Sequence, residues 1–217
     1  MTDAALQPLA PSPGVERLPN ALAGLTIVLP CFNEADNIAD AIRYATAAAE
    51  RCATGHEIVV VDDGSTDETA SVAARLAERD RRVRVVVHTR NRGYGDAVRT
   101  GIAAARMPWV FLTDADLQFD LSELEDFLPL ATHADLVVGW RILRRDLLER
   151  FTLEATGAMI STELVVKSLA AGARLEEFGV HHRPRVAGEQ SGANPRVVAR
   201  AFFELARLRR TLHAARP

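Results

Sequence analysis

Two aspartates separated by one residue, Asp114 and Asp116, are the residues whose types and spacing point most directly to chemistry. On an extended segment, side chains two positions apart project the same way, so both carboxylates could hold one hard divalent cation. Mg²⁺ and Mn²⁺ take oxygen ligands and bridge to substrate phosphates, and Gln118 offers a further amide oxygen. The alternative is that the aspartates cap a loop, since Asp is a common turn residue. The apolar run before them, residues 109–112, favours the metal interpretation.

A second acidic stretch, residues 62–67, follows another apolar run. Gly64 permits a sharp turn, and the hydroxyl residues after it can cap the next helix. A carboxylate of Asp62 or Asp63 can also accept hydrogen bonds from the imino and amino groups of a nucleobase. The stretch is therefore interpreted both as a structural turn and as a nucleobase contact, and the two interpretations are compatible.

A glycine pair in residues 91–95 resembles a phosphate loop only loosely. Gly93 and Gly95 are present, but Val98 stands where a dinucleotide fingerprint needs its third small residue. The sequence carries no Walker lysine motif, and no glycine-rich, lysine-bearing loop follows the first apolar run. These patterns argue against a Rossmann dehydrogenase, P-loop phosphoryl transfer and a nucleotidyltransferase.

Short apolar runs alternate along the chain with stretches rich in Ala, Arg and Glu. The runs predict strands buried on both faces of a sheet: residues 25–29, 57–61, 83–87, 109–112 and 135–138. The intervening stretches predict helices: residues 34–50, 67–79, 95–106 and 122–130. This alternation predicts an α/β fold with a mostly parallel central sheet and helices on both faces. The polar residues that follow the strands should then meet at one edge of the sheet, where such folds bind ligands.

The chain is divided into a lead-in, one domain and a terminal helix. Residues 1–22 contain four prolines and no apolar period, which predicts a flexible lead-in, with order beginning near Gly24. Residues 23–194 form the α/β domain. Its second half predicts a helix over 161–171 and a strand over 174–181. The final stretch, 195–217, predicts a basic amphipathic helix.

Composition and charge limit the class of protein. The 217 residues hold 26 Lys plus Arg against 29 Asp plus Glu, a net charge of -3, so no excess of positive charge marks the chain for nucleic acid. The two cysteines suit a reducing cytosol, and they are too few for a disulfide framework or a zinc cluster. No apolar run reaches the length of a membrane span, and residues 1–4 lack a secretory signal. We therefore expect a cytoplasmic protein.

Four ordered motifs carry a resemblance to a known family. They lie in residues 30–34, 60–67, 91–95 and 114–118. Together they resemble a family 2 glycosyltransferase of the GT-A fold, the Rossmann-like fold of nucleotide-diphospho-sugar transferases. Within that family the motifs are most similar to the dolichyl- or polyprenyl-phosphate sugar synthases. The match begins near residue 25.

The resemblance implies which residues bind the nucleotide. One group would lie beside it: Pro30, Phe32, Asn33, Glu34 and Gly93. Asp62 or Asp63 would contact the base, and Asp114 would contact the ribose or the metal.

The resemblance also implies the metal ligands and the catalytic groups. Asp116 and Gln118 would hold Mg²⁺ or Mn²⁺, with Asp114 as the other candidate ligand. Arg141 would lie near the phosphates, and Arg185 belongs to a late basic motif that begins at His181. The implied catalytic residues are Asp114, Asp116, Arg141 and Arg185. For His181 and His182, an ordinary strand with one inward and one outward residue is favoured over a zinc site.

The implied reaction moves a hexose, mannose or glucose, from a nucleoside-diphosphate sugar to polyprenyl or dolichyl phosphate, with inversion at the anomeric carbon. GDP-mannose and UDP-glucose both suit a carboxylate at the base. Negative charge builds on the leaving diphosphate, where a cation and arginines stabilise it. A lipid phosphate is already ionised near neutral pH, because its second pKa is about 6, so no strong general base is required.

The pattern departs from the family after Arg141. Members usually carry a substantial segment there, which supplies helices near the membrane and acceptor-side residues, whereas here the match resumes at once near Leu143. Either the acceptor site is built from elsewhere, such as Glu163 and the C-terminal helix, or the chain binds donor with weak or absent transfer. A soluble sugar or glycan acceptor and a non-catalytic nucleotide-sugar-binding module therefore stay open as alternatives.

The C-terminal stretch, residues 195–217, has six arginines against one glutamate, a local charge of +5. An anionic membrane would attract such a helix through its arginines and its apolar side chains. Phe202, Leu205 and Leu208 could equally pack on the sheet and leave the arginines in water. The sequence thus leaves two roles open for this helix, a peripheral contact with the inner face of the cell membrane or packing on the sheet, and it leaves the oligomeric state unassigned.

Overall fold

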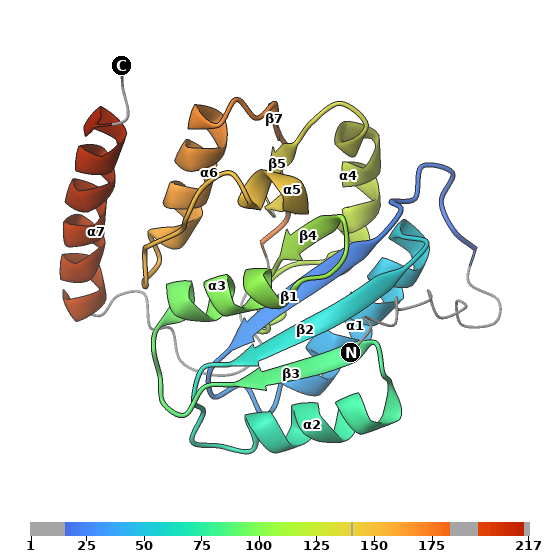
Figure 1. Ribbon diagram of the computed structural model, residues 1–217. Coiled ribbons are helices and arrows are strands. Elements are labelled where there is room, and N and C mark those ends of the chain that lie inside the picture. The colour runs from blue at the N-terminus through green and yellow to red at the C-terminus, as the bar shows by residue number, and fades with distance from the viewer. Residues whose placement is uncertain (1–15, 140, 183–194, 215–217) are drawn as a thin grey trace, which may run out of the picture.

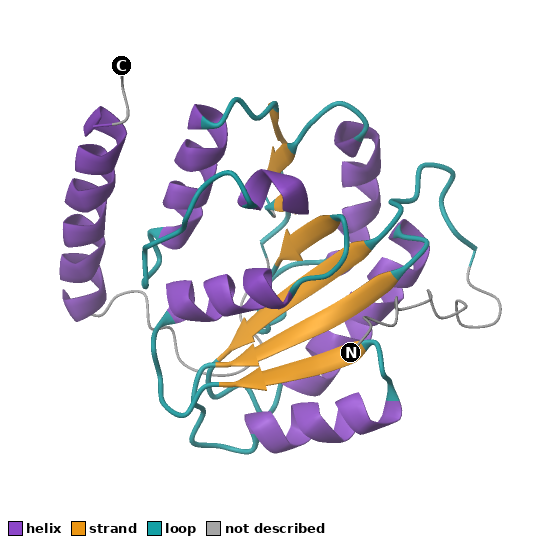
Figure 2. Cartoon of the chain, viewed as in Figure 1, coloured by secondary structure: helices purple, strands orange, loops and turns teal. Residues whose placement is uncertain are grey.

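A computed structural model describes residues 16–139, 141–182 and 195–214, and in these residues helices pack on both faces of one sheet (Figures 1 and 2). In chain order the elements are β1 Leu25–Cys31, α1 Ile38–Cys52, β2 His56–Asp62, α2 Thr69–Arg79, β3 Val83–Val87, α3 Tyr94–Ala104, β4 Trp109–Leu112, the short 3₁₀ helix η1 Leu121–Glu123, α4 Leu124–Ala131, β5 Leu136–Val138, β6 Ile142–Arg144, α5 Arg145–Leu148, α6 Ile160–Ala170, β7 Leu175–Glu177 and α7 Pro195–Ala214.

The first four strands run parallel and form the larger half of the sheet. Its strand order is β3-β2-β1-β4-β6-β5-β7. β1 pairs in parallel with β2 and β4, and β2 pairs in parallel with β3. β7 also runs parallel to its neighbour β5. The predicted α/β fold with a mostly parallel sheet is therefore confirmed.

Alternate residues of the buried strands supply two cores, one on each face of the sheet. Ile27 and Phe111 pack in the core that includes α1, α2 and α4. Val28 and Leu112 pack in the other core, with α3, α5 and α6. Successive side chains of a strand point to opposite faces, so a strand covered on both sides is apolar at nearly every position. This is why the strand runs of the sequence show no polar alternation.

The antiparallel strand β6 is an element that the sequence did not predict. It forms a hairpin with β5, with Leu136 opposite Leu143 and Val137 opposite Ile142, and it pairs with β4 on its other side. Arg141, at the turn, has a φ of 58°, in the left-handed region that few non-glycine residues adopt. The hairpin thus places β6 between β4 and β5 in the sheet.

Several predicted boundaries are wrong. The helix predicted from residue 34 begins at Ile38, because the chain first turns, with the Asn37 N–H donating to the Glu34 carbonyl at 3.0 Å. The strand predicted over 174–181 is only Leu175–Glu177. Packing also begins earlier than Gly24, since the Leu22 N–H donates to the Cys52 carbonyl at 2.8 Å and Leu22 is buried.

The C-terminal helix α7 stands at the margin of the molecule in Figure 1. Leu208 is buried, whereas Phe202 is 70% and Leu205 is 47% exposed. The alternative in which all three pack on the sheet is therefore wrong for Phe202 and Leu205. Among the described residues, no helix has the length and apolar character needed to span a bilayer.

Candidate functional site

Asn33 joins the loop after β1 to the loop after β2. Its Oδ1 accepts hydrogen bonds from the Thr66 N–H at 2.8 Å and the Thr66 hydroxyl at 3.3 Å. Its own N–H donates to Ser65 Oγ at 2.9 Å. Asn33 has a φ of 54°, a conformation that asparagine tolerates better than most residues. The residue predicted to lie beside the nucleotide therefore holds two of the predicted motifs together.

Asp67 makes a second connection between the same loops. It accepts hydrogen bonds from the Ala35 N–H at 3.1 Å and the Thr69 N–H at 3.0 Å, and the Glu34 N–H donates to Thr69 Oγ1 at 2.8 Å. Burial raises the pKa of Asp67, but the hydrogen bonds from Thr69 and Ala35 outweigh it and hold the pKa below its usual value. The carboxylate is therefore ionised at neutral pH and fixes the start of α2.

The other residues predicted beside the nucleotide differ in exposure. Pro30 is buried within β1, opposite Val61 of β2. Glu34 is also buried, and its Oε2 accepts a hydrogen bond from Asn37 Nδ2 at 2.7 Å. Phe32 lies between them in the chain and is 43% exposed. Of these three residues, Phe32 thus presents accessible surface, whereas Pro30 and Glu34 are buried.

Asp63 holds the loop that follows β3. Its side chain is almost fully buried and accepts hydrogen bonds from the Arg92 N–H at 3.0 Å and the Gly93 N–H at 2.7 Å. His88 places Nδ1 at 2.6 Å from Asp63 Oδ1 and Nε2 at 3.0 Å from Thr100 Oγ1. The Asp63 carboxylate thus fixes the backbone of residues 92 and 93, where Gly93 has a φ of 103°.

Asp62 lies at the end of β2 and accepts hydrogen bonds from the Ser65 hydroxyl and from the Ser65 N–H at 3.3 Å. Gly64 between them has a φ of 73°, and a Cβ there would lie 2.3 Å from the Arg90 carbonyl carbon. The predicted turn is therefore present. Asp62 is as deeply buried as Asp63, and the two differ in their partners: Ser65 binds the Asp62 carboxylate, whereas the loop after β3 binds the Asp63 carboxylate.

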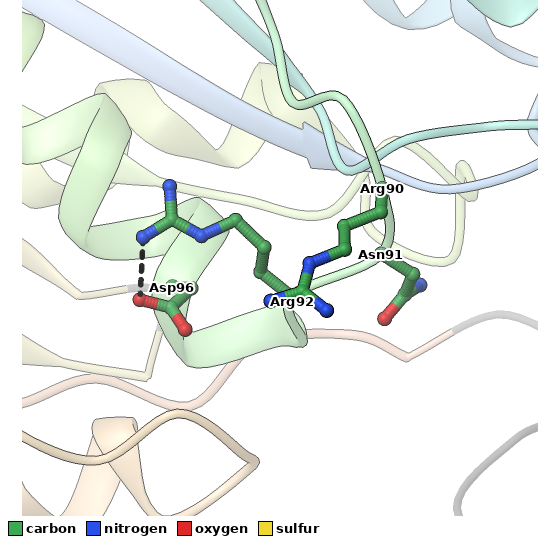
Figure 3. A pocket seen from close by; sticks show the side chains of 4 residues that line it. All are labelled: Arg90, Asn91, Arg92 and Asp96. Carbon is green, nitrogen blue, oxygen red and sulfur yellow. Dashed lines mark ion pairs between the residues drawn. The ribbon is translucent and has the colours of Figure 1, made fainter.

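A cavity of about 450 Å³ lies beside the loop after β3, lined by Arg90, Asn91, Arg92 and Asp96. Its volume falls in the range of small-molecule pockets. Figure 3 shows the Arg92 side chain reaching Asp96, with 3.5 Å between the guanidinium and the carboxylate. Two arginines on the wall suit the cavity to an anionic group such as a phosphate.

Asp114, Asp116 and Gln118 follow β4 on a turn. Ala115 and Asp116 form the turn and Leu117 has a φ of 60°, so the extended segment predicted here is wrong. Ala115 is buried and Leu117 packs against the core, whereas the three polar residues stay partly exposed. Asp116 Oδ1 accepts a hydrogen bond from the Gln118 N–H at 3.2 Å. The turn therefore still places the side chains of Ala115 and Leu117 towards the core and leaves Asp114, Asp116 and Gln118 partly exposed, as an extended segment would have done.

The chemistry of this donor set suits Mg²⁺ or Mn²⁺. Two carboxylates and an amide oxygen are hard ligands, and such ions need only one or two carboxylates when substrate phosphates and water complete the shell. In the part of the chain that the structure describes, no group of three or more His, Cys, Asp and Glu side chains is placed to hold a metal, His181 and His182 included.

Tyr94 links Asp114 to Arg141. Its hydroxyl donates to Asp114 Oδ1 at 2.9 Å and accepts from Arg141 Nη2 at 3.2 Å, while Arg141 Nη1 donates to Ser161 Oγ. Burial, with the nearby Asp114 carboxylate, raises the pKa of Tyr94 well above its usual value, so the hydroxyl keeps its proton. The structure therefore brings two of the predicted catalytic residues together, through a residue that was not predicted.

The start of the late basic motif lies next to the segment that carries Asp114, Asp116 and Gln118. His182 forms a β-bridge with Phe119 and its ring packs edge-on against the Phe119 ring, 5.2 Å between centroids. His181 lies on the surface with Nδ1 at 2.6 Å from Glu123 Oε1. Arg185 lies outside the described residues, so its role stays a prediction.

Glu163 is not open to an acceptor. It is buried and accepts hydrogen bonds from the backbone N–H of Glu154 and Ala155, at 2.9 and 2.7 Å, and from Lys167. Burial raises the pKa of Glu163, but the hydrogen bonds from Lys167 and the two N–H groups outweigh burial, so the pKa lies below its usual value. The suggestion that Glu163 contributes to an acceptor site is therefore wrong, because the carboxylate instead shapes the segment before α6.

Three residues of this arrangement escaped the sequence analysis: Tyr94, His88 and Ser161. Tyr94 lies in the stretch 91–95 that had been singled out, and His88 directly follows the strand predicted over 83–87, so their positions were a signal although their roles were not assigned. Ser161 carried no signal, since its contact with Arg141 spans 20 residues and depends on how α6 meets the hairpin turn.

Comparisons with known proteins agree with the fold and the motifs. The sequence model of Glycosyl transferase family 2 matches residues 26–171. An uncharacterized glycosyltransferase of Mycobacterium bovis is 32% identical over 204 residues, covering 76% of this chain and 88% of that protein. An undecaprenyl-phosphate 4-deoxy-4-formamido-L-arabinose transferase of an Enterobacter species is 33% identical over 120 residues, covering 55% of this chain but only 37% of that protein.

Solved structures share the fold at low sequence identity. A mannosyltransferase from Pyrobaculum calidifontis, in complex with GDP-Man and Mn²⁺, has a TM-score of 0.66 at 20% identity, covering 89% of this chain and 67% of the other. Glucosyl-3-phosphoglycerate synthase from Mycobacterium tuberculosis has a TM-score of 0.67 at 20% identity, covering 85% and 80%. The fold is thus GT-A, and with the family match over residues 26–171 the chain belongs to glycosyltransferase family 2.

Proposed function

We propose that this glycosyltransferase is an inverting, metal-dependent enzyme that moves mannose or glucose from a nucleoside-diphosphate sugar to a polyprenyl or dolichyl phosphate. One observation carries the proposal: Asp114 and Arg141, a carboxylate and a guanidinium, meet through the Tyr94 hydroxyl at the carboxyl ends of the strands. GT-A ligands are expected at that edge of the sheet. A diphosphate sugar needs both a seat for a cation and a positive side chain at the phosphates.

The residues of the chain have separate tasks in this reaction. Asp62 binds the base, Phe32 and Asn33 contact the nucleoside, and Arg141, with Arg185, stabilises the charge that builds on the leaving diphosphate. The acceptor phosphate oxygen attacks the anomeric carbon from the opposite side, the bond to the diphosphate breaks, and the configuration inverts. Because the acceptor oxygen is ionised near neutral pH, no side chain has to remove its proton.

Asp114, Asp116 and Gln118 would hold the divalent cation. When bound, Mg²⁺ or Mn²⁺ supplies positive charge that neutralises the diphosphate as it leaves. The donor chemistry of the three side chains supports this assignment. The neighbouring mannosyltransferase structure, which contains GDP-Man and Mn²⁺, supports it by analogy of fold.

The acceptor is proposed from the relatives. Relatives that are named as undecaprenyl-phosphate sugar transferases match this chain over 55% of its length. The basic charge of the C-terminal stretch and the exposed Phe202 and Phe203 support a peripheral contact with the inner, cytoplasmic face of the cell membrane, where a lipid phosphate would be met.

Replacement of Asp116 by Ala tests the proposed chemistry. Purified protein is incubated with labelled GDP-mannose or UDP-glucose, Mn²⁺ and polyprenyl phosphate, and products are separated into lipid and aqueous phases. We expect labelled lipid from the unchanged protein and a loss of at least about 100-fold in Asp116→Ala. Asp126→Ala, at an exposed position on α4, is the control.

Three other outcomes would redirect the proposal. Full activity of Asp116→Ala would refute its role as a ligand. A soluble glycosylated product would move the acceptor to a sugar or glycan. Donor binding without any product would identify a non-catalytic nucleotide-sugar-binding module, in line with the short connection after Arg141.

Sedimentation with liposomes tests the membrane contact. The full chain should pellet with vesicles that contain anionic lipid, and less so with neutral vesicles or after the double replacement of Phe202 and Phe203 by Ser. Equal pelleting of the two proteins would remove α7 from the membrane contact.

A further inference from the structure

The position of the Tyr94 hydroxyl is fixed by the backbone on both sides of it. The Gly93 N–H donates to Asp63 Oδ2 at 2.7 Å, and the Gly95 N–H donates to the Thr156 carbonyl at 2.9 Å. A Cβ on Gly95 would lie 2.5 Å from the Ala155 carbonyl oxygen, so the start of α3 packs directly against the backbone of residues 155 and 156. The Tyr94 ring packs against the core beneath α3. The hydroxyl is thus held in place independently of the two charged groups that it contacts.

Those two groups are opposite charges that would otherwise attract each other. A carboxylate and a guanidinium favour direct, often bidentate contact, and in a partly buried site that attraction is strong. Here the hydroxyl lies between them, donating to Asp114 at 2.9 Å and accepting from Arg141 at 3.2 Å. A hydroxyl is suited to this place, because one O–H donor and two lone pairs satisfy an anion and a cation at once.

We propose that Tyr94 is a positioning residue that acts as a spacer, keeping the Asp114 carboxylate and the Arg141 guanidinium from forming a direct ion pair. The inference rests on the proposed function, in which Asp114 faces the cation or the ribose and Arg141 faces the phosphates. A direct pair would neutralise both charges and withdraw both from the diphosphate. Ser161, which accepts from Nη1, restrains the guanidinium from its other side.

Replacement of Tyr94 by Phe tests the spacer with little change to the fold. The variant loses only the hydroxyl and keeps the ring in the core. Tyr44→Phe is the matched control, since the two tyrosines are the only ones in the chain and Tyr44 is 48% exposed on α1, beneath Arg43. Mn²⁺ binding is measured by calorimetry at saturating GDP and at saturating UDP, and kcat and KM for the donor are measured with polyprenyl phosphate.

We expect Mn²⁺ affinity and kcat to fall about 10- to 100-fold in Tyr94→Phe, the range of a hydrogen bond to a charged group, and to stay unchanged in Tyr44→Phe. The decisive variant is Tyr94→Phe combined with Arg141→Met. Without a guanidinium to capture Asp114, Mn²⁺ affinity should return towards that of Arg141→Met alone, while kcat stays low. A residue that only supported the fold would show no such recovery.

The outcomes separate the spacer from the function on which it rests. Absence of Mn²⁺-dependent nucleotide binding in the unchanged protein would overturn the proposed function itself. Normal binding there, with Tyr94→Phe equal to Tyr44→Phe, would overturn the spacer alone. Weakened Mn²⁺ binding in Tyr94→Phe that the Arg141→Met replacement does not restore would also overturn it, because Tyr94 would then support Asp114 directly.

Discussion

The two halves of the sheet are built differently. The parallel half, β1–β4 with α1–α3, has β1 and β2 strands of seven residues each, almost wholly buried. The hairpin half, β5–β7 with α5–α7, has strands of three residues each. Long buried strands with short loops fix a frame by themselves, whereas three-residue strands need neighbours to hold them. The parallel half therefore carries the residues proposed to bind the nucleotide on a rigid frame, and the hairpin half is positioned by its contacts with that frame.

The contacts between the halves pass close to the predicted catalytic residues. Arg141 reaches Tyr94, its carbonyl accepts from the Leu112 N–H at 3.1 Å, and the Thr156 carbonyl accepts from the Gly95 N–H. Within the hairpin half, Glu204 of α7 accepts from the Thr156 N–H at 2.9 Å. Changes within the parallel half should thus reduce stability and donor binding together, changes at the junction should reduce activity more than stability, and changes within the hairpin half should have small effects.

The largest effect is expected from Asp63→Ala, in the parallel half. The change leaves the buried His88 and the N–H groups of Arg92 and Gly93 without their acceptor, so we expect a loss of about 3 kcal/mol in the free energy of unfolding, together with weaker donor binding. Urea denaturation and calorimetry with GDP and UDP measure the two effects. Asp126→Ala, on the exposed face of α4, should change the free energy by less than about 0.5 kcal/mol. Equal stability of the two variants would contradict the rigid frame.

A smaller loss is expected from Gly95→Ala, at the junction. The added Cβ would meet the Ala155 carbonyl oxygen at 2.5 Å and the Thr156 carbonyl carbon at 2.7 Å, and neither backbone atom can move aside easily. Alanine gains about 1 kcal/mol in a helix, but overpacking costs about 1–3 kcal/mol, so the net change in stability should be modest. Displacement of Tyr94 and the 155–156 segment should reduce kcat more strongly.

Gly179→Ala provides the matched control for the junction. A Cβ at Gly179 would meet nothing within 4 Å, so both stability and kcat should be unchanged. If Gly95→Ala retained full kcat while losing stability, the junction would be structural only, and the comparison between the halves would lose its functional meaning.

The sequence predicted the parallel half well and the hairpin half poorly, for a physical reason. β1 and β2 are long and almost wholly buried, and β3 and β4 are shorter but still rich in apolar residues, so the positions of these strands and the polar residues after them were visible. β6 has three residues and no period of its own, and its place is decided by pairing with β4 and β5. The helix α5 that follows it has only four residues, which is too short to show a helical pattern in the sequence.

The candidate site divides in the same way. Asn33 and Asp114 were visible because each lies two residues after the end of a buried strand. Tyr94 was not assigned, since its role depends on Arg141, 47 residues away, reaching the same hydroxyl. The turn at residues 115–117 was also missed, because a left-handed φ at Leu117 has no signal in a residue that usually avoids it.

The smallest effect is expected from Asp135→Asn, within the hairpin half. Hydrogen bonds from Arg174, chiefly its side chain, lower the pKa of Asp135 to about 2, although burial raises it. A lowered pKa means that the ionised carboxylate stabilises the fold above its unfolded pKa of about 3.9, and that this contribution is lost as the pH falls towards 2. Asp135→Asn should therefore be slightly less stable than the unchanged protein at pH 6, and the difference should shrink by pH 2.5. Urea denaturation at both pH values measures it. Arg174 is largely exposed, at 62%, so the effect should be well below that of Asp63→Ala. A loss as large as that of Asp63→Ala would mean that the hairpin half carries its own stability and does not depend on the parallel half.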